Sequence, residues 1–119
     1  MGGNMGHGNH IGGVEGYTSQ EAMTWVNESD TGLKIVKKYF MLTNIEPINN
    51  KGQRHGLWVV YWFRDQLYYT GKYVNDERHG YWVTYYADGS LCSKGTYDMG
   101  KRIGIWGYGY NEEKILYAN

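Results

Sequence analysis

Cysteine and proline are nearly missing from this chain of 119 residues, where each occurs once. The single cysteine, Cys92, excludes a disulfide framework within the chain and favours a reducing compartment. No apolar run approaches the roughly 20 residues that a membrane-spanning helix needs. Lys plus Arg and Asp plus Glu each total 12, so the formal net charge is zero. A chain with no basic excess lacks the main source of affinity for nucleic acid or for an anionic membrane surface.

Basic residues are also absent from the first 33 positions, which carry four acidic residues. An organellar presequence would be rich in Arg, and a secretory signal would need a basic start and an apolar stretch, so neither is indicated. The sequence therefore favours a reducing intracellular compartment or a virion, with no signal peptide or transmembrane segment. Residues 1–16 include seven glycines, which predicts a flexible tail.

Glycine and aromatic residues are abundant instead, with 18 Gly, 13 Tyr, 5 Trp and 2 Phe. In a chain with one proline, this composition is typical of short strands joined by tight turns. An internal repeat organises these residues, because residues 55–78 align with residues 79–102 without a gap. Repeats of this length are stacked supersecondary units. The identical pairs are His55/His79, Gly56/Gly80, Trp58/Trp82, Val59/Val83, Tyr61/Tyr85, Leu67/Leu91, Gly71/Gly95, Tyr73/Tyr97 and Arg78/Arg102.

Two further copies of the repeat are incomplete. Residues 103–119 keep Gly104 and Trp106 in register and then end, and an eroded copy covers residues 31–54 with Lys34 in the tryptophan column. The sequence thus predicts three regions. They are a Gly-rich tail at 1–16, a capped helix segment at 17–33 and a sheet of repeats at 34–119.

Each repeat unit predicts a β-hairpin. Asp88-Gly89 lies between two runs of β-branched and aromatic residues, and it is a strong two-residue hairpin signal because both positions tolerate positive φ. Gly71 and Gly95 fall inside strands, where they leave room for a Trp or Tyr ring of the adjacent hairpin. The predicted fold is mainly β, with stacked hairpins in one elongated, twisted antiparallel sheet and a short N-terminal helix. The predicted strands of the repeats lie at 57–63, 67–73, 81–86, 91–97 and 114–118.

Alternation along the strands predicts two apolar faces. The residues predicted to stack from repeat to repeat are Trp58, Trp82, Trp106, Gly71, Gly95, Tyr73 and Tyr97. The opposite face presents Leu57, Val59, Tyr61, Tyr81, Val83 and Tyr85. A ten-residue helix is only about 15 Å long and covers part of one face. We therefore expect an exposed apolar surface, centred on these six residues or on the opposing tryptophan face, that forms an interface with residues 1–16 laid along another chain.

The segment before the repeats predicts one helix and one strand. Thr18 and Glu21 form a capping box at the start of a helix over residues 19–28. Its apolar positions are Ala22, Met23, Trp25 and Val26. A helix of this length is marginal alone and needs packing to persist. Residues 34–45 indicate a further strand that ends before Pro47.

The recurring pattern is [H/I]-G-x-W-x-x-Y, a hairpin tip, and then L-x-x-x-G-x-Y. It resembles the MORN-repeat variant of bacterial and phage proteins, some of which are described as antitoxin components. The resemblance covers residues 51–119, although this chain has only about two and a half copies. It implies an elongated sheet of stacked hairpins that serves as an interaction or scaffolding module.

The residues that suggest chemistry also have structural interpretations. His55 and His79 share their repeat column with Ile103, which indicates a packing or turn position. His7 and His10 lack a nearby Cys or carboxylate to complete a tetrahedral metal set. Cys92 aligns with strand positions of the other copies. The sequence therefore predicts no enzyme, no catalytic residue, no cofactor and no metal.

Basic residues recur at the repeat spacing, and aromatic rings on a sheet can stack bases. These residues are Lys72, Lys94, Arg54, Arg78 and Arg102. The alternative is that the three arginines lie in the turns between hairpins. Residues 34–119 hold 12 basic residues against 8 acidic ones, so the charge of this region is only +4. This small excess argues against nucleic acid, and the lack of a polybasic cluster argues against a membrane surface.

Two functions stay open. The first is a non-enzymatic structural or accessory subunit, or scaffold, whose aromatic sheet and N-terminal tail contact other protein chains in a larger assembly or oligomer. The second is an antitoxin-like or inhibitory regulatory protein that binds and blocks a partner enzyme.

Overall fold

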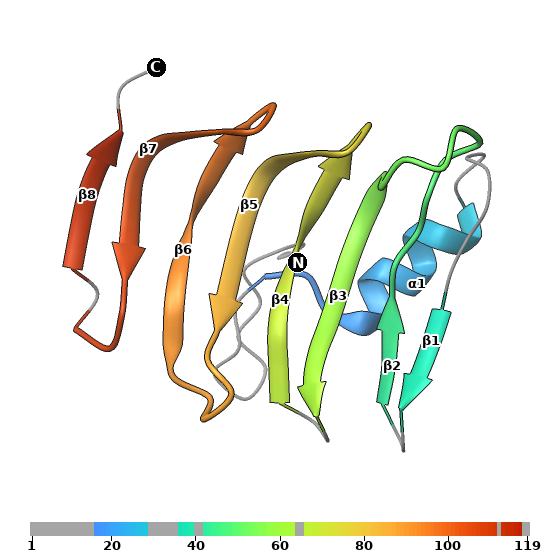
Figure 1. The fold of residues 1–119 in the computed structure, drawn as a ribbon, viewed down its shortest axis with the longest axis horizontal. Coiled ribbons are helices and arrows are strands. Elements are labelled where there is room, and N and C mark those ends of the chain that lie inside the picture. The colour runs from blue at the N-terminus through green and yellow to red at the C-terminus, as the bar shows by residue number, and fades with distance from the viewer. Residues whose placement is uncertain (1–15, 29–35, 40–41, 64–65, 112, 118–119) are drawn as a thin grey trace, which may run out of the picture.

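Figure 1 shows the computed structural model, which describes residues 16–28, 36–39, 42–63, 66–111 and 113–117. These residues form one helix and one eight-stranded antiparallel sheet in which the strands follow the order of the sequence. The mainly β class, with one open sheet and a short helix, is confirmed. Within the described residues, no helix has the length and apolar character to cross a membrane. The elements are α1 (Ser19–Glu28), β1 (Val36–Tyr39), β2 (Leu42–Ile45), β3 (Gly56–Phe63), β4 (Gln66–Val74), β5 (Glu77–Tyr85), β6 (Leu91–Asp98), β7 (Lys101–Tyr108) and β8 (Glu113–Tyr117).

Helix α1 begins at the predicted capping box. The Thr18 amide donates to Glu21 Oε1 at 2.8 Å, and the Glu21 amide donates to Thr18 Oγ1 at 3.1 Å. Ala22 and Val26 are buried where α1 packs on β2 and β3, because residues four apart share one side of a helix. The predicted helix and its cap are therefore confirmed.

The turns between the repeat units contain two residues each. Asn75 and Asp76 join β4 to β5 with φ of 47° and 75°, and Met99 and Gly100 join β6 to β7 with φ of 47° and 90°. Positive φ at both central residues gives the right twist for a two-residue hairpin. Both turns are closed in the same way. The Asp76 amide donates to the Arg54 carbonyl, and the Gly100 amide donates to the Arg78 carbonyl, each at 2.8 Å.

The prediction of a two-residue turn at Asp88-Gly89 is wrong in detail. Only Gly89 has a positive φ, at 93°. The Gly89 amide donates to the Tyr86 carbonyl, and Asp88 Oδ1 accepts from the Ser90 amide at 2.9 Å. The carboxylate therefore caps a longer loop between β5 and β6 in place of a tight turn.

The single strand predicted at 34–45 is instead a hairpin of β1 and β2. Val36 pairs with Ile45 and Tyr39 pairs with Leu42, so the two halves satisfy each other's backbone hydrogen bonds. The eroded repeat therefore contributes two strands to the sheet. The tail at 1–15 and Lys34 lie outside the described residues.

The sheet has two faces with different cores. The helix face is built on Ile45, Val59 and Val83, which pack with Ala22 and Val26 of α1. The tryptophan face is built on Trp58, Trp82 and Trp106 together with Tyr73 and Tyr97. No described helix packs on the second face, because α1 contacts the sheet on the first.

Candidate binding groove on the tryptophan face

The three tryptophans of the repeat column occupy equivalent places in successive hairpins. Each indole Nε1–H donates to a backbone carbonyl, from Trp58 to Pro47 at 2.9 Å, from Trp82 to Lys72 at 2.9 Å and from Trp106 to Thr96 at 3.1 Å. The structure thus brings the column together on one face. All three indole N–H groups are satisfied, as a buried Trp requires.

Two glycines give the tryptophan rings their space. A Cβ on Gly71 would lie 2.1 Å from Trp82 Cδ2, and a Cβ on Gly95 would lie 2.2 Å from Trp106 Cδ2. These distances are far inside van der Waals contact, so only glycine fits. The ring of one hairpin therefore lies on the bare backbone of the preceding hairpin.

A β-bulge aims each ring at its glycine. Lys72 pairs with His79 and Thr70 pairs with Val83, so three residues of β5 lie opposite the single residue Gly71. The first of these three residues is Gly80, whose φ of 79° favours glycine. Extra residues bend a strand, and β5 and β7 curve visibly in Figure 1.

Tyrosines and arginines complete this face. Tyr97 lies edge-on between Trp82 and Trp106, with centroids 6.2 and 5.0 Å away. Arg78 lies 5.5 Å from the Trp82 centroid and 5.6 Å from the Tyr97 centroid, while Arg102 lies 5.0 Å from the Trp106 centroid. Cation–π attraction therefore fixes both guanidinium groups above the rings. We call Arg54, Arg78 and Arg102 the arginine row.

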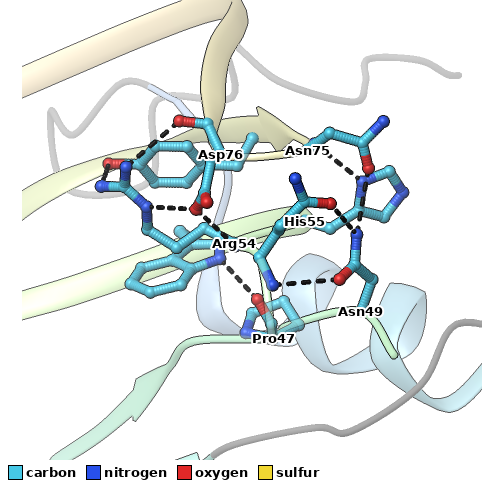
Figure 2. Close-up of polar contacts among 9 residues, drawn as sticks. Pro47, Asn49, Arg54, His55, Asn75 and Asp76 are labelled. Carbon is cyan, nitrogen blue, oxygen red and sulfur yellow. Dashed lines mark hydrogen bonds and ion pairs between the residues drawn. The ribbon is translucent and has the colours of Figure 1, made fainter. Parts of the chain in front are cut away.

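The first member of the row, Arg54, is held differently (Figure 2). Its Nε donates to Asp76 Oδ1 at 3.0 Å, and its Nη1 donates to the Tyr73 hydroxyl at 3.1 Å. The Arg54 amide also donates to Asp76 Oδ1 at 2.8 Å. The hydrogen bond from this amide, followed by that from the side chain, lowers the pKa of the Asp76 carboxyl.

The arginine row borders a groove of about 540 Å³ that spans strands β4 to β7. A second hollow of about 410 Å³ adjoins it and shares the lining residues Arg78, Tyr97 and Arg102. Burial raises the pKa of Tyr69, which lines the first hollow, and this phenol stays neutral at ordinary pH. The groove thus combines a neutral aromatic floor with cationic groups along one side.

The expectation that the arginines lie in turns is wrong for two of them. Arg78 pairs with Tyr73 inside the β4–β5 ladder, and Arg102 pairs with Tyr97 inside the β6–β7 ladder. Both belong to strands because the turns take only the two residues before Glu77 and Lys101. Sequence reasoning recognised the arginine column but missed its position above the rings. Arg78 follows Tyr73 and Arg102 follows Tyr97 at the same distance of five residues. This constant spacing is the sequence signal that could have indicated the contact.

The predicted interaction surface needs correction. Val59 and Val83 are 1% and 0% exposed, Tyr85 is 9% exposed, and Leu57, Tyr61 and Tyr81 pack around this same core. Gly16 lies against Thr70 and Val83, and the Thr70 hydroxyl donates to the Tyr17 carbonyl at 3.1 Å. The helix and the residues before it therefore cover this surface within the chain. At the β7–β8 end, the paired residues Ile105 and Leu116 are exposed.

The two histidines of the repeat serve turns. His55 Nδ1 accepts from the Asn75 amide and His79 Nδ1 accepts from the Met99 amide, each at 3.1 Å. Each imidazole thereby supports the first residue of a tight turn. In the described part of the chain, no three His, Cys, Asp or Glu side chains gather as a metal site. Cys92 is half-buried in β6, and His7 and His10 lie outside the described residues.

Compared with known proteins, the chain matches no family model, no curated protein and no solved structure. The resemblance of residues 51–119 to MORN repeats therefore stays a prediction.

Proposed function

We propose that this chain is a non-enzymatic binding module, a scaffold or accessory subunit, that contacts another protein through the groove on the tryptophan face. The observation that carries the proposal is the arginine row along the groove. Exposed guanidinium groups held over aromatic rings form a preorganised surface, and Arg and aromatic residues are enriched where proteins bind partners.

The shape of the groove supports a chain-like partner. Its larger hollow is lined by residues of β4 to β7, and a second hollow adjoins it at Arg78, Tyr97 and Arg102. A small molecule is usually enclosed by a single deep pocket. An elongated, open groove suits an extended or helical protein segment better.

The roles of the remaining polar residues also support binding over catalysis. The Nδ1 atoms of His55 and His79 accept hydrogen bonds from turn amides. A general base needs its lone pair directed at a substrate. These imidazole atoms are instead used to hold the turns that present the arginine row.

A quantitative pull-down from the native source tests the proposal. The bait is the full chain as wild type, as the groove variant R78Q/R102Q, or as the control K51Q/K72Q, which removes the same charge away from the groove. Circular dichroism first establishes that all three fold. We expect partners retained by the wild type and the control to be lost from the groove variant. Equal retention by all three baits would exclude the groove as the binding surface.

A further inference from the structure

The three members of the arginine row differ in whether their guanidinium group has a carboxylate partner within the chain. Arg54 forms an ion pair with Asp76 at 3.0 Å. Among the described residues, no carboxylate lies within ion-pair distance of the guanidinium groups of Arg78 or Arg102. Both side chains are exposed. At the first position of the row, Arg54 binds a carboxylate of the chain itself. The equivalent guanidinium groups of Arg78 and Arg102 are available to carboxylates of a partner.

The aromatic rings hold Arg78 and Arg102 in the orientation that an anion requires. Arg102 lies 5.9 Å from the Tyr97 centroid, 5.0 Å from the Trp106 centroid and 5.9 Å from the Tyr117 centroid. A guanidinium that packs against rings keeps its N–H edge for a carboxylate, which it binds in a bidentate manner. Because the side chain is fixed beforehand, less rotamer entropy is lost on binding.

Single-stranded nucleic acid fits this surface poorly. Base stacking needs exposed rings, yet Trp82, Trp106 and Tyr97 are only 3%, 1% and 8% exposed. The same edge of the sheet also carries Asp98 and Glu77, both exposed. Such carboxylates repel a backbone with a phosphate at every nucleotide, whereas they permit separate carboxylates placed over each arginine.

The spacing of the two arginines sets the spacing of the partner's acidic groups. Arg78 and Arg102 occupy the same position in β5 and β7, two strands apart. Strands in a sheet are about 4.8 Å apart, so these positions are about 10 Å apart. Resting on the proposed function, we infer that the groove binds an acidic protein segment that presents two carboxylates about 10 Å apart to Arg78 and Arg102.

Proline-rich peptides with glutamates at defined positions test this spacing. A polyproline II helix rises about 3.1 Å per residue with three residues per turn, so glutamates at i and i+3 share one side about 9 Å apart. The probes are three such peptides, with Glu at i and i+3, with Glu at i and i+2, or with Gln at i and i+3. Each is titrated into the full chain at low salt, and the NMR signals of the Arg Nε–H groups are followed.

We expect the i,i+3 glutamate peptide to bind about fivefold more tightly than the i,i+2 peptide, which keeps one charge-assisted contact, and about 25-fold more tightly than the Gln peptide, which keeps neither. The preference should disappear in R78Q/R102Q and persist in K51Q/K72Q. Equal binding of the Glu and Gln peptides, or a preference that survives in R78Q/R102Q, would overturn the inference. Tighter binding of a single-stranded oligothymidylate through the same arginines would assign the row to nucleic acid instead. If the peptides fail this test while the groove variant still loses its protein partner, the groove remains the interface and only its acidic specificity is wrong.

Discussion

The helix face and the tryptophan face of this sheet exclude water by different means. On the helix face, a second layer of chain covers the strands, and Val83 is completely buried beneath residues 16–28. On the tryptophan face, Trp82 is 3% exposed although no described helix lies over it. Its ring lies flat on Gly71, beside Tyr73 and Tyr97. The comparison shows that paired Trp and Gly columns let a repeat sheet bury a face without a second layer.

This difference decides which face is available to a partner. A helix of ten residues is about 15 Å long, so α1 covers only the first strands. On the opposite face, the tryptophan column provides burial without a covering layer, at Trp58, Trp82 and Trp106 of β3, β5 and β7. The outer surface of that column then carries arginines, so the face that needs no covering layer is the one we assign to binding.

The largest expected effect comes from removing the central ring of the tryptophan face. Trp82→Ala deletes a buried aromatic side chain and leaves a cavity over Gly71, which should cost about 3–5 kcal/mol of unfolding free energy. Urea denaturation followed by circular dichroism measures the loss. A variant with the stability of the wild type would show that the ring contributes little to this face.

A smaller loss is expected when a methyl group is forced between a glycine and its ring. Gly95→Ala places Cβ 2.2 Å from Trp106 Cδ2, so the ring must shift, at a cost of about 1–3 kcal/mol.

Gly107→Ala is the matched control on β7, because its added Cβ meets Lys94 Cε at an ordinary 3.6 Å. Its effect on the free energy of unfolding should be near zero or slightly stabilising, because alanine lowers the conformational entropy of the unfolded chain. Similar losses in both variants, measured by urea denaturation, would assign the cost to strand glycines in general.

The capping box of α1 tests how residues 16–28 cover the helix face. Thr18→Ala removes the hydroxyl that accepts from the Glu21 amide and should cost about 1 kcal/mol. Hydrogen exchange should become faster at α1 amides while β6 and β7 keep their protection. Equal acceleration across the whole sheet would indicate that the two faces do not unfold separately.

The smallest effect concerns the arginine row at acid pH. The pKa of Asp76 is lowered from 3.8 by its hydrogen bonds from Arg54, so its contribution to stability is present above that value and is lost as the pH falls through the folded pKa. Asp76→Asn removes this dependence, so the variant should lose less stability than the wild type below about pH 4. Urea midpoints of both proteins across this pH range measure the difference. The same pH dependence in the wild type and the variant would show that protonation of Asp76 is not coupled to folding.

Much of this fold follows from the repeat columns. Thr18 and Glu21 predict the helix start because a capping box is local, and the Trp and Gly columns predict strand contacts because equivalent residues recur in every hairpin. The position of the tight turns was not predictable in the same way. Asn75-Asp76 and Asp88-Gly89 both tolerate positive φ, and only the ladder registers distinguish them.

The burial of the helix face was not predictable, for a tertiary reason. Leu57, Val59 and Tyr61 present an apolar pattern that is the same whether a helix or a partner covers it. Sequence periodicity carries no information on where α1 docks. The arginine column was visible, and residues four apart on a strand share a face, but the contact of Arg102 with Trp106 depends on side-chain packing that spacing alone does not give.

The central feature of this molecule is a tryptophan face that is closed beneath an exposed arginine row. Hydrogen exchange of the indole Nε1–H groups, resolved by NMR, tests this for each tryptophan. All four indoles donate to backbone carbonyls, but Trp58, Trp82 and Trp106 are at most 8% exposed whereas Trp62 is 42% exposed. We predict that the three buried indoles exchange only on global unfolding and that Trp62 exchanges much faster. Exchange of Trp82 or Trp106 as fast as that of Trp62 would contradict the account.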